Sequence, residues 1–306
     1  MPTEVPKIEE NFSTSQNAAQ KAIEECWADL PDGRMRYLHA GVGRPLILIH
    51  GLMGYSFSWR FSLPALAPHA ECFAIDNMGA GFSIAPVKMD CSMTAHAERV
   101  LQFVDALGLT EYDLLGTSHG GAIAMLTAAL SAQRRDSRLK RLILVAPVNP
   151  WSRHGRRLAP LIGSRVGSAL FRNTVAQWRS LDYVWLRRMF GDGSKIPPDS
   201  VAGYRRPVVE NRAFHHGQQI VRTWLADLDE LERAIAVIGH YSTLLMWGTR
   251  DRAVSYRSAE TLRQKFRDCQ LVTFKGVGHL PYEEAAEQFN RSLIEYLAST
   301  PRKIAS

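Results

Sequence analysis

The sequence predicts an α/β fold in which a mostly parallel central sheet carries helices on both faces and an inserted helical cap. Three observations predict it. Short, nearly continuous apolar runs, typical of strands covered on both faces, recur along the chain. Helix-forming segments alternate with these runs, which favours parallel strands joined by helices. One long segment, residues 151–227, contains no such run and is rich in arginine and aromatic residues.

The composition is that of an ordinary globular protein. Of the 306 residues, 46% are hydrophobic and 22% are charged. No apolar run approaches the length of about 18 residues that a membrane span needs. The first sixteen residues, MPTEVPKIEENFSTSQ, lack the basic and apolar regions of a secretory signal. We therefore expect a cytoplasmic protein without a membrane span.

The first elements along the chain are an N-terminal extension and a hairpin. Residues 1–26 are expected to form the extension, with one short helix in it. Residues 26–41, CWADLPDGRMRYLHAG, contain two strand-like runs around a Pro-Asp-Gly turn. This pattern predicts two antiparallel strands at the start of the fold.

The remaining core elements follow as strands and helices in alternation. Three helices are indicated: one whose apolar residues lead up to Gly108, one over residues 122–130, and one containing Phe289, Leu293 and Leu297. Buried strands are predicted at residues 45–51 (PLILIHG), 71–79 (ECFAIDNMG), 111–116 (EYDLLG), 141–147 (RLILVAP), 242–248 (STLLMWG) and 271–276 (LVTFKG).

These elements divide the chain into a core and a cap. The core is expected to comprise residues 27–150 and 228–306, and the cap residues 151–227. The net charge of +7 comes from the cap, because residues 151–208 hold eleven Lys and Arg against three Asp. Such a segment fits an anionic partner such as a membrane surface, a nucleic acid or an acidic substrate. Since no nucleic-acid motif accompanies the charge, we favour a solvated helical face and expect no nucleic-acid partner.

The cysteines indicate neither a metal site nor disulfide bonds. Cys26, Cys72, Cys91 and Cys269 are widely scattered and form no CxxC pair. We therefore expect reduced thiols, no metal and no cofactor.

A nucleophile is predicted at the turn after the third of the buried strands. Residues 116–120 read Gly-Thr-Ser-His-Gly, which matches G-x-S-x-G. In this motif a sharp strand-to-helix turn exposes the serine oxygen, and the flanking positions must be small because side chains there would collide with the neighbouring strand or helix. Ser118 is the candidate nucleophile.

A serine hydroxyl needs a base and an orienting acid to react at neutral pH. His279 lies in a glycine-flanked loop after the last predicted strand, and Asp251 lies just past the end of the strand before it. The carboxyl ends of strands are where open α/β sheets build their sites. We predict a catalytic triad of Ser118, Asp251 and His279.

The order nucleophile, acid, histidine is that of the α/β-hydrolase fold, and the chain resembles this superfamily from about residue 27 to 298. Residues 50–54 (HGLMG) are similar to the family's oxyanion loop, and residues 58–60 (SWR) stand where relatives often carry Trp. Residues 76–83 (DNMGAGFS) resemble its D-x-x-G-x-G-x-S loop. The resemblance is to the serine branch with a helical cap, carboxylesterase-like, with loops also similar to those of epoxide hydrolases.

This resemblance implies roles for several loop residues. The backbone N–H groups of Leu52 and His119 would form the oxyanion hole, with no reacting role for the His119 side chain. His50 is expected to brace its loop, and Asp76 to stabilise the loop around it.

The serine also implies the class of reaction. Family members that open epoxides or displace halide carry an aspartate where Ser118 stands, so the resemblance implies acyl transfer on a carboxylic ester. Related alternatives are a hydrolase of carbon–carbon bonds in meta-cleavage products, a cofactor-free perhydrolase and a lactonase. Such carbon–carbon hydrolases often show Trp after the histidine, whereas Leu280 and Pro281 follow His279 here. A triad-retaining small-molecule receptor is the alternative from another class.

The substrate is expected to be a small to medium uncharged ester, because aromatic and apolar residues cluster near the predicted site. Packing between cap and core is the competing explanation for these aromatics. The predicted pocket residues are Met53, Tyr55, Trp178, Tyr183, Trp185 and Phe190.

Overall fold

A computed structural model describes residues 23–151, 179–210 and 213–299 of the chain. Most of the short helix predicted in the N-terminal extension falls outside these residues, and so does Trp178. Glu24 and Glu25, at the end of the extension, lie in a strand instead.

The chain enters the sheet through the predicted hairpin. Strands β1 (Glu24–Leu30) and β2 (Gly33–Ala40) pair antiparallel, and Leu30 pairs with Gly33 at the turn. A side chain at position 33 would place its Cβ 2.2 Å from the carbonyl oxygen of Ile84, and the φ of Gly33 is +143°. Glycine is therefore required there. The hairpin prediction is confirmed.

The sheet has eight strands in the order β1-β2-β4-β3-β5-β6-β7-β8. β2 pairs antiparallel with β4, and all pairs from β4 to β8 are parallel. The predicted fold class is confirmed, and every predicted buried run contains a strand. The six strands after the hairpin are β3 (Pro45–Ile49), β4 (Glu71–Ile75), β5 (Tyr112–Thr117), β6 (Leu139–Val145), β7 (Ser242–Gly248) and β8 (Cys269–Phe274).

Both faces of the sheet are covered, as the continuous apolar runs predict. Along β3, Leu46 and Leu48 join one apolar cluster while Ile47 and Ile49 join the other. This alternation follows from the two-residue period of a strand. The first cluster packs under α2 (Leu63–Leu66) and α12 (Ala286–Ala298), and the second under α3 (Met93–Ala106), α4 (His119–Gln133) and α10 (Arg257–Arg263).

Local sequence explains where α3 begins and ends. The Ser92 side chain accepts a hydrogen bond from the backbone N–H of Ala95, which caps the first turn. Gly108, just past the helix, has a φ of +63°. The predicted stop at Gly108 is confirmed.

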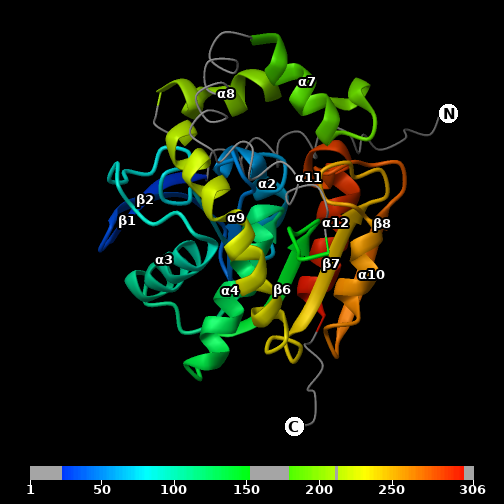
Figure 1. The fold of residues 1–306 in the computed structure, drawn as a ribbon. Coiled ribbons are helices and arrows are strands. Elements are labelled where there is room, and N and C mark those ends of the chain that lie inside the picture. Colours follow the sequence, from blue (N-terminus) through cyan, green and yellow to red (C-terminus); the bar gives the residue numbers. More distant parts are fainter. Residues whose placement is uncertain (1–22, 152–178, 211–212, 300–306) are drawn as a thin grey trace, which may run out of the picture.

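The described residues between β6 and β7 form helices joined by loops and turns, with no strand among them. The helices are α7 (Arg179–Met189), the short η2 (Gly193–Lys195), α8 (Ser200–Glu210) and α9 (Ala213–Ile235). Figure 1 shows α7 and α8 together at one end of the molecule, while α9 runs from their level down beside α4. The expected cap boundary between residues 227 and 228 falls inside α9.

Two further features concern the described residues alone. Within them, no helix combines the length and the apolar character that crossing a membrane requires. All four cysteines lie in this part of the chain and are free thiols.

Candidate active site

Ser118 occupies the turn between β5 and α4. Its φ of 53° is unusual for a residue other than glycine. Backbone hydrogen bonds hold the turn: the Ser118 N–H donates to the carbonyl of Val145, and its own carbonyl accepts from Gly121 and Val148. The surrounding structure therefore holds this strained backbone in place, as is common at functional sites.

The glycines around Ser118 are needed because the turn is so tight. A Cβ on Gly116 would lie 2.2 Å from the carbonyl oxygen of Gly120 in α4. A Cβ on Gly120 would lie 2.3 Å from the carbonyl oxygen of His50. The predicted collision with a neighbouring strand end or helix is confirmed at both positions.

Asp251 and His279 lie together at the carboxyl ends of β7 and β8. The Nδ1 atom of His279 is 2.8 Å from Oδ2 of Asp251. The other carboxylate oxygen, Oδ1, accepts hydrogen bonds from the backbone N–H groups of Ala253 (2.8 Å) and Val254 (2.9 Å). Each oxygen of Asp251 thus has its own partners, which fixes the carboxylate plane and the imidazole with it.

Glu284 anchors the loop that carries His279. Its carboxylate accepts backbone hydrogen bonds from Gly278 (2.7 Å), Gly191 (2.8 Å) and Asp192 (2.8 Å). The His279 N–H also donates to the carbonyl of Met189 at the end of α7. The position of the histidine therefore depends on α7 and the loop after it as well as on the elements of the sheet.

Ser118 and His279 line one cavity of about 320 Å³ between the core and the helices above it. The aliphatic, methionine and tryptophan side chains that line it make its wall mainly apolar. These residues are Leu52, Met53, Val148, Trp185, Met189, Val221, Trp224, Val254 and Leu280.

The predicted pocket residues divide into two groups. Met53 and Trp185 line the cavity. Tyr55 instead is buried and donates a hydrogen bond to the carbonyl of Gly203 (3.0 Å), and Phe190 packs in an apolar cluster. Tyr183 is 46% exposed. Aromatic content alone did not distinguish lining residues from packing residues.

The sequence patterns did not indicate that α9 and three polar residues line the cavity. Gln218, Val221 and Trp224 line the cavity and recur every three residues, a spacing that puts them on one side of a helix. That spacing was the available signal. Ser58, Tyr204 and Tyr282 also line the cavity. Ser58 lies in the stretch 58–60 that resembles the family, but no sequence pattern indicated a role for its side chain or marked the two tyrosines.

The predicted oxyanion loop lies against Ser118. A Cβ built on Gly51 would be 3.1 Å from the Cβ of Ser118 and 3.7 Å from its hydroxyl oxygen. Leu52 follows directly, and His119 is the first residue of α4, where backbone N–H groups have no acceptor within the helix. The expected donors thus belong to the two segments that adjoin Ser118.

His50 braces this loop, as expected. Its Nδ1 donates to the carbonyl of Gly51 (2.8 Å), and its Nε2 accepts from the backbone N–H of Asn77 (3.0 Å). Burial lowers the pKa of His50, so the neutral form that this pairing requires is favoured. His50 therefore ties the oxyanion loop to the loop after β4.

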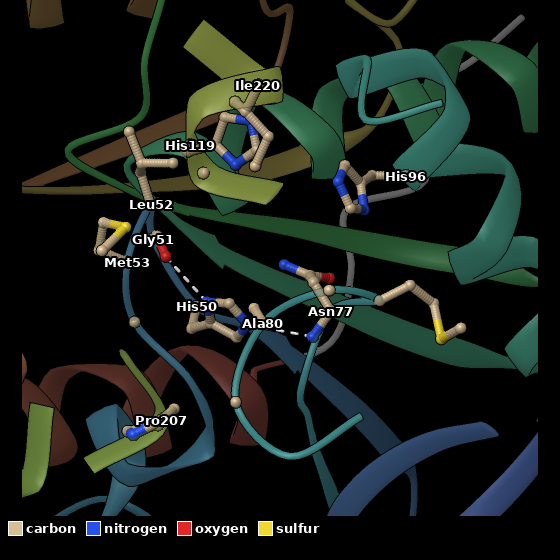
Figure 2. Close-up of a pocket in the computed structure, with 15 residues that line it drawn as sticks. His50, Gly51, Leu52, Met53, Asn77, Ala80, His96, His119, Pro207 and Ile220 are labelled. Atoms are coloured by element: carbon tan, nitrogen blue, oxygen red, sulfur yellow. Dashed lines mark hydrogen bonds between the residues drawn. The ribbon is translucent and has the colours of Figure 1, made fainter. Parts of the chain in front are cut away.

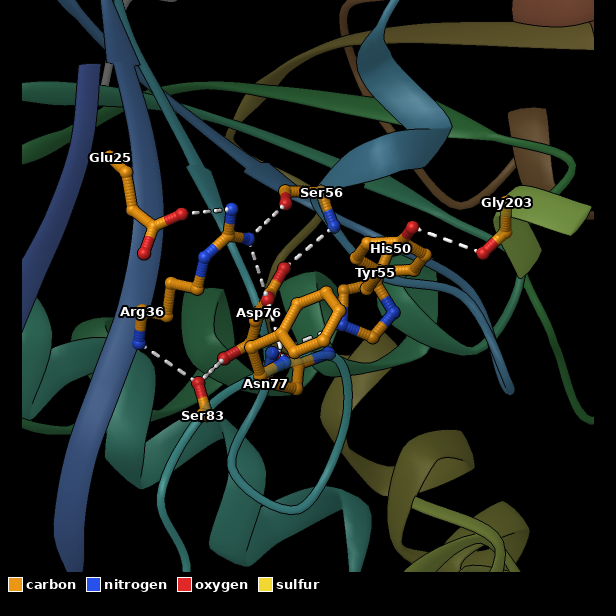
Figure 3. A network of polar contacts seen from close by, with 10 residues as sticks. Glu25, Arg36, His50, Tyr55, Ser56, Asp76, Asn77, Ser83 and Gly203 are labelled. Atoms are coloured by element: carbon orange, nitrogen blue, oxygen red, sulfur yellow. Dashed lines mark hydrogen bonds and ion pairs between the residues drawn. The ribbon is translucent and has the colours of Figure 1, made fainter. Parts of the chain in front are cut away.

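Asp76 stabilises the same region through a buried ion pair (Figure 3). Its carboxylate accepts from the backbone N–H groups of Ser56 (2.7 Å) and Phe82 (3.0 Å) and pairs with Arg36 (3.0 Å). Arg36 in turn pairs with Glu25 of β1 at 2.7 Å. This network joins the hairpin to the segment that follows the oxyanion loop and to the loop after β4. It agrees with the supporting role expected of Asp76.

A second, much smaller cavity lies behind the oxyanion loop (Figure 2). His50, His96 and His119 line it, and its volume of about 20 Å³ is close to that of one water molecule. The His119 ring stacks on Trp224 with centroids 5.9 Å apart. The side chain of His119 thus lines this cavity, whereas His279 lines the one that contains Ser118. No group of three or more metal-ligating side chains is assembled in the described residues.

These buried histidines should make the protein acid-sensitive. Burial lowers the pKa of His119 to about 3 and also lowers those of His50 and His96. Below the ordinary histidine pKa of about 6.5, these side chains bind protons in the unfolded chain but stay neutral in the native state. The free energy of unfolding therefore decreases as pH falls.

We expect each such histidine to add about 1.4 kcal/mol per pH unit to the slope of unfolding free energy against pH. Urea unfolding from about pH 7 to about pH 5 measures this slope. His119→Gln should reduce it by that amount. Parallel curves for the variant and the wild type would contradict the assignment.

Comparison with known proteins places this geometry in a family. A family model described as the alpha/beta hydrolase fold matches residues 44–286. The chain belongs to this family. The hydrolase is 32% identical to haloalkane dehalogenase 2 of Mycobacterium tuberculosis over 286 residues, which cover 89% of this chain and 94% of that protein.

A second relative and a solved structure are also named as hydrolases. The hydrolase is 26% identical to 2-hydroxymuconate semialdehyde hydrolase of Pseudomonas sp. CF600, covering 92% of this chain and 97% of that protein. A solved structure of a meta-cleavage product hydrolase from Pseudomonas fluorescens IP01 superposes with a TM-score of 0.74 at 22% identity, covering 89% and 96% of the two chains. The latter likeness shows the shared fold.

Proposed function

We propose that this hydrolase cleaves carboxylic esters through an acyl-enzyme intermediate, with Ser118 as nucleophile, His279 as base and Asp251 as orienting acid. One observation carries the proposal. The imidazole held by Asp251 at 2.8 Å lines the same cavity as the strained serine.

The proposed reaction runs in two stages. His279 accepts the hydroxyl proton through Nε2 while the Ser118 oxygen attacks the ester carbonyl. The backbone N–H groups of Leu52 and His119 stabilise the oxyanion of the tetrahedral intermediate. His279 then protonates the departing alcohol, and a water molecule activated by the same imidazole releases the acid.

The serine argues against halide displacement, the reaction in the name of the 32% identical relative. Attack by a serine hydroxyl on an alkyl halide would leave an ether on the enzyme, and an ether has no carbonyl for water to attack. A carboxylate nucleophile would leave an ester, which water can hydrolyse. Ser118 therefore favours acyl transfer.

Hydrolysis of a carbon–carbon bond in a meta-cleavage product is the second candidate. A 26% identical relative is named 2-hydroxymuconate semialdehyde hydrolase, and the same serine and histidine would suit such a reaction. Perhydrolysis and lactone hydrolysis would also use the triad. A receptor would bind such molecules without repeated turnover.

A substrate panel separates these candidates. Purified protein is assayed on p-nitrophenyl esters, lactones and a meta-cleavage product, with Ser118→Ala as the matched control. Multiple turnover of esters that the control lacks supports the proposal. Turnover of the meta-cleavage product alone supports the second candidate, and binding without turnover supports a receptor.

The cytoplasmic location stays a prediction from the N-terminal sequence.

The cavity wall favours uncharged substrates of small to medium size. Its volume of about 320 Å³ and its mainly apolar lining suit an aliphatic or aromatic acyl or alcohol group. We expect Trp185, at the cap side of the cavity, to contact the apolar part of the ester.

Replacing Trp185 with alanine should therefore change chain-length preference. We expect kcat/KM for an octanoate ester to fall by about 1–3 kcal/mol more than that for an acetate ester, the range for burying a large apolar group. Tyr183→Ala is the matched control, since Tyr183 belongs to the same helix and is about as exposed as Trp185 (46% against 44%), whereas of the two only Trp185 lines the cavity. Equal losses on both esters for Trp185→Ala would show that this residue only packs the cap.

A further inference from the structure

The mainly apolar cavity wall contains a polar group that the proposed triad chemistry does not use. Ser58, Tyr204 and Tyr282 all line the cavity. They come from three separate elements, namely η1 (Ser56–Trp59), α8 and α11 (Pro281–Glu284). Polar side chains placed on an apolar wall usually orient a ligand and select it.

A buried carboxylate lies behind two of these residues. The side chain of Glu283 is fully buried and pairs with Arg60 at 3.1 Å. The Tyr204 hydroxyl donates to Oε1 of Glu283, and the Ser200 hydroxyl lies 3.3 Å from Oε2. Burial and the nearby Glu283 charge raise the pKa of Tyr204 well above its usual value, so the phenol keeps its proton.

The number of available protons fixes which group donates in each hydrogen bond among Ser58, Tyr204 and Glu283. Tyr204 has one O–H, and an ionised Glu283 can only accept it. The Ser58 hydroxyl oxygen is 3.2 Å from the Tyr204 oxygen, so Ser58 must be the donor in that contact. The protons therefore run from Ser58 to Tyr204 to Glu283, which leaves the Ser58 oxygen as an acceptor. The Tyr282 hydroxyl also hydrogen-bonds the Ser58 side chain, and since a hydroxyl oxygen has two lone pairs, one stays available to a substrate even when Tyr282 donates to the other.

The accepting end of this chain lines the same cavity as Ser118 and His279. The Ser58 oxygen is 3.1 Å from the place that a Cβ on Gly54 would occupy, so it adjoins the oxyanion loop. Hydrogen bonds in a chain strengthen one another, and the negative charge at Glu283 makes the Ser58 oxygen a better acceptor. A substrate hydroxyl can donate to it, whereas an ionised substrate carboxylate has no proton to donate and would meet only lone pairs.

We propose that Ser58, Tyr204 and Glu283 form a subsite for a neutral hydrogen-bond donor, so that the preferred substrates are esters bearing a hydroxyl group near the scissile carbonyl. This inference rests on the proposed ester hydrolysis and names its substrate class. Tyr204 and Glu283 act as positioning residues, because they act on the substrate through Ser58.

The test compares kcat/KM for methyl butanoate, its 2-hydroxy and 3-hydroxy derivatives, and monomethyl succinate. We expect at least one hydroxy ester to exceed methyl butanoate by about tenfold, the effect of one good hydrogen bond, and monomethyl succinate to be the poorest substrate. Ser58→Ala and Tyr204→Phe should both bring the ratio of hydroxy to plain ester close to one.

Tyr55→Phe is the matched control for the attachment of the cap. It removes another tyrosine hydrogen bond between the core and α8, from Tyr55 to the carbonyl of Gly203, and leaves the hydroxyl chain in place. The ratio in this variant should equal that of the wild type. Thermal unfolding of all variants identifies any that fail to fold, and either Ser58→Ala or Tyr204→Phe alone suffices for the test.

A wild type that does not prefer any hydroxy ester would overturn the inference, and so would a preference that survives in both variants. Ester turnover that depends on Ser118 but ignores the hydroxyl would leave the proposed function intact. If no ester is turned over, the proposed function fails, and binding to Ser118→Ala protein tests the subsite separately. Calorimetry with 3-hydroxybutananilide and butananilide should show tighter binding of the hydroxylated compound, and equal binding would overturn the subsite.

Discussion

Replacing Ser118 with alanine should lower kcat for ester hydrolysis by on the order of 10⁴-fold or more, because the nucleophile and the covalent intermediate are both lost. Residual activity would come from the oxyanion hole and substrate binding. The measurement is the initial rate on a p-nitrophenyl ester with purified protein.

The fold should survive this substitution. Alanine keeps the Cβ that already occupies the strained backbone with a φ of 53°, so the turn is no more strained than before. The backbone hydrogen bonds to Val145, Gly121 and Val148 do not involve the hydroxyl. Midpoints of thermal unfolding should therefore agree closely. More than a few percent of wild-type activity in a well-folded variant would show that another residue is the nucleophile.

Replacing Asp251 with asparagine should lower kcat by about 10⁴-fold, as the matching change does in serine proteases. The structure supplies the reason. Oδ1 accepts from the N–H groups of Ala253 and Val254, so the asparagine oxygen must take that place. Its amide nitrogen then faces Nδ1 of His279, which lies 2.8 Å from the other oxygen in the wild type.

That arrangement makes Nδ1 of His279 an acceptor and puts the imidazole proton on Nε2. The ring can then no longer accept the Ser118 proton. Asp105→Asn is the control, because this aspartate belongs to α3, is 63% exposed and pairs with Arg138 at 2.7 Å. Near-normal activity of Asp251→Asn would mean that a different carboxylate orients the base.

The sequence by itself determined the fold class and the candidate triad. Strand-length apolar runs, the glycines at positions 116 and 120, and polar residues just after strand ends are local patterns. Parallel strands bring their carboxyl ends to one edge, so such patterns suffice to place Ser118, Asp251 and His279 at that edge. The tight contacts of both glycines and the 2.8 Å pairing of Asp251 with His279 agree with them.

Only the tertiary structure decided which side chains line the cavity. Tyr55 and Trp185 are both large aromatics in the segments expected to surround the site, yet one is bonded to the Gly203 carbonyl and the other lines the cavity. The difference depends on how α8 and α9 pack over the core, which involves contacts between residues far apart in sequence. The pairing of Tyr204 with Glu283 spans 79 positions for the same reason. Sequence periodicity predicts which face of a helix or strand is apolar. Packing between elements decides which residues that face contacts.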